Sequence, residues 1–146
     1  MGLFQVIQLH GNEDRAYIQA LRKEVPEAEI WQAFPIKGPE TLLQASASQA
    51  DRVLLDSGQG SGKAFDWSLL AAFQRPFILA GGLQPNNLEQ AILQVKPLGV
   101  DLSSGIETSG LKDPEKMILA TTLARKAFLT LSASQPERSC TDPMVV

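Results

Sequence analysis

The feature that most constrains the fold of this chain is a fivefold alternation of short apolar runs with segments of helical spacing. Each run ends in a polar or glycine residue before the helical segment begins. Such an alternation predicts βαβ units in a parallel sheet with right-handed crossovers, so we expect an α/β fold. The expected strands are Phe4–Leu9, Glu29–Phe34, Arg52–Asp56, Pro76–Ala80 and Leu98–Leu102, and the expected helices are Asn12–Val25, Glu40–Ala47, Asp66–Phe73, Pro85–Val95 and one that begins at Asp113–Pro114.

The last two expected strands end in the sequences FILAGGL and GVDLSSG. Enzymes with a β/α barrel place their chemistry at the carboxyl ends of the strands, and the loops after strands 7 and 8 often hold a substrate phosphate. Glycine lets backbone N–H groups turn toward an anion. Either turn alone could simply need small residues, but the two together favour a phosphate site. Its candidate residues are Gly81, Gly82, Ser103, Ser104 and Gly105.

The length of the chain limits how much of such a barrel it can form. A complete barrel needs about 250 residues, whereas the chain has 146. Five strands cannot close a barrel, so we expect an incomplete, open (β/α)8 TIM barrel over residues 1–131. Open sheet edges expose unpaired backbone groups and favour self-association. Residues 132–146 are polar and aperiodic and are expected to form a disordered tail.

The amino-acid composition limits the classes of molecule that the protein is expected to bind. The formal net charge is −3, with 13 basic and 16 acidic residues and no basic run, which argues against nucleic acid and anionic membranes and favours a small molecule. A single cysteine, Cys140, allows no disulfide within the chain and no cysteine metal cluster. We find neither a signal peptide nor a membrane span in the sequence, and we expect a cytoplasmic protein.

Three titratable residues stand at or near strand ends. Asp56 ends an apolar strand, where partial desolvation favours the protonated form that a general acid needs. The alternative is that Asp56 braces the loop that follows it. His10 ends the first strand, where a structural hydrogen bond is more common than catalysis. Asp101 lies one residue before the end of the last strand, and we expect it to brace neighbouring loops from the barrel interior.

A glycine-rich loop, SGQGSGK, follows Asp56. It mixes glycines with Ser61 and Lys63, but a nucleotide P-loop needs Ser or Thr after the lysine, and Ala64 stands there. We interpret the loop as a lid over a phosphorylated substrate, with Gly60 and Gly62 as substrate-binding residues; a plain surface loop is the alternative.

The segments VIQLHGNE, LLDSGQGSGKAFDWSLL, LAGGLQPNNLEQAI and GVDLSSGIETSGLKD together resemble the carboxyl-terminal part of phosphoribosylanthranilate isomerase. The resemblance covers residues from about 3 to about 131. It implies that the expected strands correspond to strands four to eight of a (β/α)8 barrel. It also implies an Amadori rearrangement in tryptophan biosynthesis, from N-(5-phosphoribosyl)anthranilate to 1-(2-carboxyphenylamino)-1-deoxyribulose 5-phosphate, without metal or organic cofactor.

By this resemblance, Asp56 protonates the ribose ring oxygen, His10 lies at the rim of the active site, and the glycine and serine turns bind the phosphate. The family's general base is a cysteine in a KICG-like motif on strand one, which this sequence lacks, since Cys140 lies in the tail. Gln32 stands where the family often has lysine.

We therefore expect that the first three β/α units are missing and that the chain alone shows little or no turnover. The alternatives are a non-catalytic phosphate-binding half-barrel and another phosphate-binding barrel enzyme.

Overall fold

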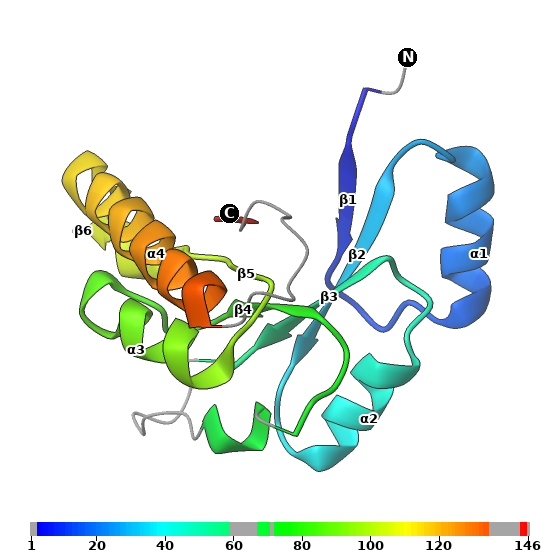
Figure 1. Cartoon of the computed structure of the whole chain (residues 1–146). Coiled ribbons are helices and arrows are strands. Elements are labelled where there is room, and N and C mark those ends of the chain that lie inside the picture. Colours follow the sequence, from blue (N-terminus) through cyan, green and yellow to red (C-terminus); the bar gives the residue numbers. More distant parts are fainter. Residues whose placement is uncertain (1–2, 59–66, 71, 135–143, 146) are drawn as a thin grey trace.

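The structure is a computed structural model that describes residues 3–58, 67–70, 72–134 and 144–145 (Figure 1). Parallel strands alternate with helices along the chain. The strands of the main sheet are β1 (Val6–Leu9), β2 (Glu29–Pro35), β3 (Arg52–Asp56), β4 (Phe77–Ala80), β5 (Gly99–Val100) and β8 (Met144–Val145). The helices are α1 (Arg15–Glu24), α2 (Pro39–Ala47), α3 (Pro85–Val95) and α4 (Pro114–Ser134), with short 3-10 helices η1 (Trp67–Leu70) and η2 (Ser104–Ile106).

The main sheet has the order β1-β2-β3-β4-β5-β8, and every pair in it is parallel. This order confirms the predicted α/β class and the five predicted parallel strands. β1 and β8 are the two ends of the sheet and do not pair with each other, so the sheet is open, as expected. A separate antiparallel hairpin, β6 (Glu107–Thr108) and β7 (Leu111–Lys112), follows β5.

Several boundaries differ from the sequence prediction. α1 begins at Arg15 rather than Asn12, because the Asp14 side chain caps it by accepting the Tyr17 N–H. Of the predicted helix 66–73, the described residues contain only the 3-10 turn η1. α4 continues to Ser134, and β8 adds a strand to the sheet. Residues 132–134 and 144–145 therefore differ from the predicted disordered tail, whose residues 135–143 and 146 lie outside the described ones.

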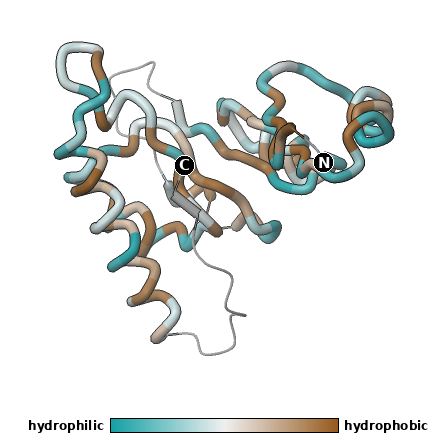
Figure 2. The backbone as a smooth tube through the Cα atoms, turned by 90° about the horizontal axis from the view of Figure 1, so that it is seen from above, coloured by the Kyte–Doolittle hydropathy of each residue, from teal (hydrophilic) through white to brown (hydrophobic). Residues whose placement is uncertain are grey.

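The two faces of the sheet have different neighbours, because successive residues of a strand point to opposite sides. Val53, Leu55 and Leu79 pack with α3 and α4 in the largest hydrophobic cluster, and Ile30 packs with α1. The opposite face, here called the inner face, carries a second cluster of buried side chains. Its members are Trp31, Ala33, Leu54, Ile78 and Ala80. Hydrophobic residues accordingly follow the strands through the middle of the molecule (Figure 2).

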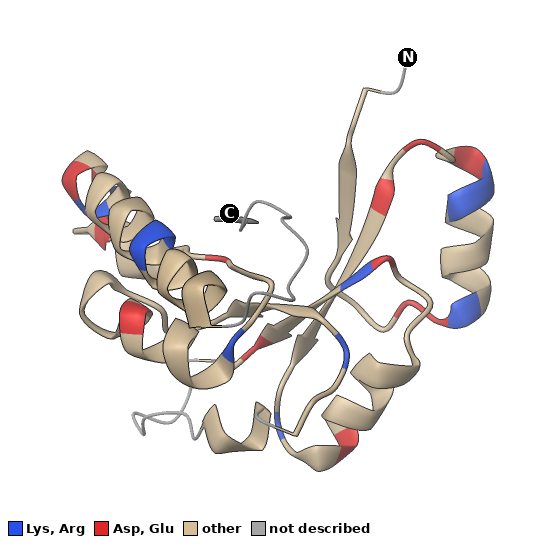
Figure 3. Ribbon diagram, in the orientation of Figure 1, with Lys and Arg blue, Asp and Glu red and all other residues tan. Residues whose placement is uncertain are grey.

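α4 packs on the core through small residues in its first half and through larger ones further along. Ala120 and Ala124 are buried, and so are Phe128 and Leu131, whereas Ile118 is 69% exposed. The predicted helix is thus present, and its alanines allow α3 and α4 to approach closely. Acidic and basic side chains are interspersed over the described elements (Figure 3).

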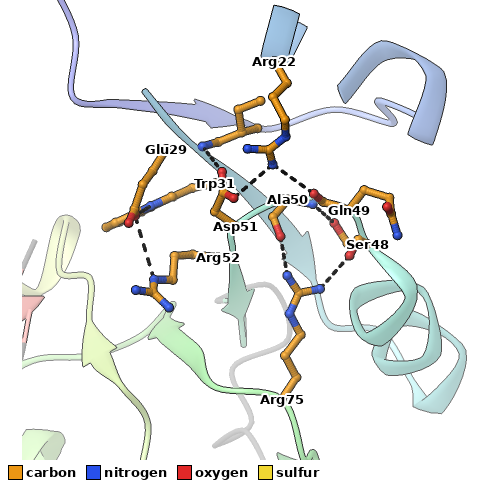
Figure 4. A network of polar contacts seen from close by, with 10 residues as sticks. Arg22, Glu29, Trp31, Ser48, Gln49, Ala50, Asp51, Arg52 and Arg75 are labelled. Carbon is orange, nitrogen blue, oxygen red and sulfur yellow. Dashed lines mark hydrogen bonds and ion pairs between the residues drawn. The ribbon is translucent and has the colours of Figure 1, made fainter. Parts of the chain in front are cut away.

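A polar network ties the amino ends of β2 and β3 to α1 (Figure 4). Asp51 accepts the Ile30 N–H at 2.8 Å and pairs with Arg22 at 3.0 Å. Burial alone would raise the pKa of Asp51, but the Ile30 N–H and the Arg22 guanidinium outweigh it and hold this pKa below its usual value. The network lies at the end of the strands where barrel folds place stability rather than chemistry.

Arg75 joins the same network from the segment before β4 (Figure 4). Its guanidinium donates to the carbonyl oxygens of Ala45 at 3.2 Å and Ser48 at 2.8 Å, and also to that of Ala50. One side chain therefore donates to several carbonyl groups at and after the end of α2, where the helix itself supplies few N–H partners.

Candidate active site

The carboxyl ends of β3, β4 and β5 lie side by side at one edge of the sheet. In the register of the parallel pair β3–β4, Asp56 is opposite Ala80. The Asp101 N–H donates to the Leu79 carbonyl at 2.9 Å. Parallel pairing therefore brings the residues that follow these strands to one place, although they are far apart in the sequence.

The turn after β4, here called the β4 turn, consists of Gly81 and Gly82. Both residues adopt left-handed backbone conformations, with φ of 83° and 63°. A β-carbon on Gly81 would overlap Oδ1 of Asp56 and lie 2.6 Å from the Gly58 nitrogen. Position 81 therefore requires glycine for two separate reasons, its φ angle and the adjacent carboxylate.

The carbonyl oxygens of the β4 turn and of the residue before it accept hydrogen bonds from other residues of the protein. The Ser57 N–H donates to the Ala80 carbonyl at 2.9 Å, and the Ser57 hydroxyl lies 2.8 Å from the Gly81 carbonyl oxygen. The Asn87 side-chain amide donates to the Gly82 carbonyl at 2.9 Å. Among the hydrogen bonds between described residues, none uses the N–H of Gly81 or Gly82. The turn therefore offers donors and no free carbonyl oxygen.

The turn after β5, here called the β5 turn, consists of Ser103, Ser104 and Gly105 and packs directly on the residues after the β4 turn. A β-carbon on Gly105 would overlap the Leu83 carbonyl oxygen. Lys112 donates to the Ser103 carbonyl at 2.9 Å. Within the described ranges, no hydrogen bond uses the N–H groups of Ser103, Ser104 or Gly105. Two neighbouring turns thus present backbone donors, an arrangement that can bind an anion.

The carboxyl groups of Asp56 and Asp101 interact at this edge of the sheet. Burial and the nearby Asp56 carboxylate raise the pKa of Asp101, while the charges of His10 and Lys112 partly offset the rise. Asp56 also accepts the Gly58 N–H at 2.8 Å through Oδ1. Asp56 thus braces the following loop, which was the alternative to a catalytic role, and at the same time lies against the β4 turn.

Gly60, Gly62 and Cys140 lie outside the described residues, so the predicted lid stays a prediction. Gln32 is buried with only 4% of its surface exposed. Its side-chain amide donates to the Glu13 carbonyl at 2.8 Å and accepts from the Ser48 hydroxyl at 2.6 Å. Gln32 therefore joins the loop before α1 to the end of α2, away from the two turns.

Sequence reasoning missed three residues that hold the turns in place, namely Ser57, Asn87 and Lys112. Ser57 could have been noticed because it directly follows the strand-terminal Asp56. Asn87 could have been noticed as the third residue of α3, where its side chain also accepts the Gln84 N–H.

A hollow among the described residues lies elsewhere. It has a volume of 540 Å³ and lies between the loop after β1, the end of β2 and α2. Its lining includes Glu13, Gln32 and Lys37 but neither Asp56 nor either turn.

Among the described residues, no group of three or more His, Cys, Asp or Glu side chains is arranged to hold a metal ion. None of the helices described has both the length and the apolar character that crossing a membrane would require.

The fold and the two turns define a parallel β/α protein of the barrel class with a candidate site at the carboxyl ends of its strands. Residues 2–122 match the family model described as N-(5'phosphoribosyl)anthranilate (PRA) isomerase. The chain belongs to this family of isomerases. Family membership also decides against the alternative of a different phosphate-binding barrel enzyme.

Individual relatives agree with the family model. The chain is 42% identical over 118 residues to N-(5'-phosphoribosyl)anthranilate isomerase of Endomicrobium trichonymphae, covering 77% of this chain and 57% of the relative. It is 42% identical over 146 residues to the isomerase of Azorhizobium caulinodans, covering 91% of this chain and 62% of the relative. The chain thus spans about three fifths of the length of these relatives.

A solved structure shares the fold at similar coverage. It is a phosphoribosyl anthranilate isomerase in complex with reduced 1-(o-carboxyphenylamino)-1-deoxyribulose 5-phosphate. The TM-score is 0.67 at 31% identity, and the match covers 84% of this chain and 60% of that one. This relative supports the assignment of the open sheet to part of the isomerase fold.

Proposed function

We propose that this protein takes part in the rearrangement of N-(5-phosphoribosyl)anthranilate to 1-(2-carboxyphenylamino)-1-deoxyribulose 5-phosphate, in tryptophan biosynthesis. It would contribute the phosphate-binding turns and the general acid. The observation that carries the proposal is the contact of the Asp56 carboxylate with the β4 turn, which itself adjoins the β5 turn. The phosphorylated ligand named for a solved relative supports a substrate of this class.

The two turns account for the binding of the substrate phosphate in this proposal. Phosphate accepts hydrogen bonds from the free backbone N–H groups of both turns, with the amino end of α3 adding a favourable dipole. Anchoring the phosphate fixes the sugar relative to Asp56, so that binding energy is used to orient the reacting atoms.

In the first chemical step of the proposed reaction, Asp56 is the proton donor. Its protonated carboxyl group gives a proton to the ribose ring oxygen while the C1–O bond breaks, and the anthranilate nitrogen supplies the electron pair that forms the C=N bond. A base then removes the proton from C2, and the resulting enol-amine tautomerises to the ketone. The family resemblance assigns this base to a cysteine of strand one; Cys140, the only cysteine, lies outside the described residues.

Binding and turnover test this proposal separately. Calorimetry with reduced 1-(o-carboxyphenylamino)-1-deoxyribulose 5-phosphate and with inorganic phosphate should show binding of both, and ribose, which lacks the phosphate, should not bind. The chain alone should show little or no turnover. Mixing it with the amino-terminal segment of a related isomerase should restore some.

The Asp56→Asn variant provides the decisive comparison. In the mixture it should keep phosphate affinity and lose about 100-fold or more of the restored turnover, since general acid catalysis contributes that much. Failure of the wild-type chain to bind the analogue would contradict the proposal, and so would full turnover with Asp56→Asn. Robust turnover by the chain alone would contradict the expected need for a second segment.

A second candidate function is self-association without catalysis, and the free edge of β1 favours it. Leu3 and Phe4, just before β1, are 93% and 66% exposed, and Val6 is 39% exposed. Among the described strands β1 pairs only with β2, and exposed apolar residues beside such a sheet edge favour pairing with another chain. Sedimentation equilibrium tests this: a monomer at all concentrations would exclude it, whereas dimers that disappear in Val6→Lys would support it.

We also propose that the protein works in the cytoplasm, on the basis of its membership in a family of biosynthetic isomerases. Cell fractionation with detection of the tagged chain tests this location, and recovery in the membrane or secreted fraction would contradict it.

A further inference from the structure

The hairpin β6–β7 is anchored between the β5 turn and the start of α4. Its connecting residues Ser109 and Gly110 both have positive φ, 54° and 79°, as two-residue hairpin turns require. The Asp113 N–H donates to the Ile106 carbonyl at 2.9 Å, and its carboxylate accepts from the Thr108 hydroxyl at 2.6 Å. These bonds fix where the last residue of the hairpin, Lys112, is placed.

The Lys112 ammonium group contacts three oxygen atoms. It lies 2.9 Å from the Ser103 carbonyl oxygen, 3.4 Å from the Ser103 hydroxyl and 2.8 Å from a carboxylate oxygen of Glu107. Glu107 is directly opposite Lys112 in the hairpin. A lysine has three N–H donors, so these contacts match its full donor capacity.

The Ser103 carbonyl accepts from Lys112 at 2.9 Å and, less closely, from the Ile106 N–H at 3.4 Å, and its direction sets that of the next N–H group. In a planar trans peptide the C=O and N–H bonds point in opposite directions. Holding the Ser103 oxygen toward Lys112 therefore directs the Ser104 N–H away from Lys112. The same arrangement occurs in the β4 turn, where Ser57 and Asn87 hold the carbonyl groups and no bond from a described residue uses the N–H groups of Gly81 and Gly82.

We propose that Lys112 is a positioning residue of the anion site: its ammonium group holds the Ser103 carbonyl so that the Ser104 N–H is presented to the phosphate. This inference rests on the proposed function, which places the phosphate at the two turns. Glu107 keeps the ammonium group in place as its cross-strand partner. The charge of Lys112 also reaches the site, because it opposes the rise in the pKa of Asp101.

The experiment measures the affinity of the chain for inorganic phosphate by NMR titration, together with the amide resonance of Ser104 in the free protein. Lys112→Met should weaken phosphate binding about tenfold, the effect of one lost charge-assisted hydrogen bond, and should shift the Ser104 amide. Lys112→Arg keeps a charged donor and should restore affinity to within about threefold of wild type. Lys126→Met is the charge-matched control, because Lys126 pairs with Glu89 on α3.

Each outcome decides the proposal. Wild-type affinity in Lys112→Met would overturn the inference and leave the proposed function standing. An equal loss in Lys126→Met would also overturn it, because the effect would then be one of net charge. If the wild-type chain binds no phosphate, the proposed function loses its anion site. The Ser104 amide resonance of Lys112→Met then decides whether Lys112 orients the β5 turn. A resonance unchanged from wild type would overturn the inference.

Discussion

The Asp56 carboxylate lies so close to Gly81 that a β-carbon on the glycine would overlap its Oδ1 atom. The acid that ends β3 and the glycine that directly follows β4 are therefore in close contact. In the proposed reaction the acid must reach the sugar ring while the glycine turn binds the phosphate of the same molecule. Their contact places both functions within the reach of one small substrate.

Gly81→Ala should reduce both phosphate affinity and stability. The new methyl group displaces Asp56 and strains a backbone with φ of 83°, at a cost of about 1–3 kcal/mol in the free energy of unfolding. Gly110→Ala is the matched control, because Gly110 has φ of 79° but no atom within 4 Å of its β-carbon position. Urea unfolding and phosphate titration measure the two effects.

The difference between these two variants isolates the contact with Asp56 from backbone strain. In the free energy of unfolding, Gly110→Ala should show only the cost of strain, and the loss in Gly81→Ala should be larger. Equal losses of stability in both variants would show that the overlap with Asp56 has no consequence.

Asp101 should make the protein less stable as the pH rises. Because its pKa is raised in the folded state, chiefly by burial and then by Asp56, its favourable contribution is present below the unfolded pKa of about 3.9. That contribution is lost as the pH rises through the folded pKa. Asp101→Asn should therefore be more stable than wild type at pH 7 and similar to it near pH 3, as measured by urea unfolding.

Asp56→Asn provides the complementary test, since it removes one of the causes of the shift. The pKa of Asp101, followed by carboxyl carbon NMR, should decrease in this variant. An unchanged titration of Asp101 would show that the two carboxyl groups do not interact.

The sequence predicted the strands and helices well because most of them carry a clear hydrophobic period. β8 was not predicted, because the two residues Met144 and Val145 are too short a run to show any period. The buried residues of α4 were not predicted either, because this helix carries apolar residues on more than one side. Packing in the main cluster buries Ala120 and Ala124 and leaves Ile118 exposed.

The sequence predicted parts of the candidate site only where a single residue type indicates the local structure. Glycines after a strand indicate a turn, so the positions of Gly81 and Gly82 could be read from the sequence. Lys112 could not, because its partner is a backbone carbonyl nine positions away that any residue would supply. The interaction between Asp56 and Asp101 likewise depends on the order of strands in the sheet.

Ser57→Ala should loosen the β4 turn. The serine is 7% exposed, and its hydroxyl satisfies the Gly81 carbonyl at 2.8 Å. Its loss should cost about 1–2 kcal/mol of stability and weaken phosphate binding several-fold, since the turn is less fixed. Ser134→Ala is the control: it removes a hydroxyl bond of 2.8 Å to the Leu131 carbonyl, far along α4. Unchanged affinity in Ser57→Ala would contradict this role.

The Asp51 network should affect stability and leave ligand binding unchanged, because it lies at the amino ends of the strands. The folded-state pKa of Asp51 is lowered, so its contribution is present above the unfolded pKa of about 3.9 and is lost as the pH falls through the folded pKa. Asp51→Asn should lower the free energy of unfolding by about 1–2 kcal/mol at pH 7, as expected for bonds to a charged group that is partly solvated.

The difference between this variant and wild type should shrink as the pH falls through the folded pKa of Asp51, because the wild-type side chain then loses its charge. Glu27→Gln, which removes an exposed carboxylate, should leave the difference between pH 7 and pH 2 unchanged. Phosphate affinity should be the same in all three proteins. If Asp51→Asn binds phosphate more weakly at the same folded population, the network at the amino ends and the two turns are coupled. The prediction that this network affects only stability would then be wrong.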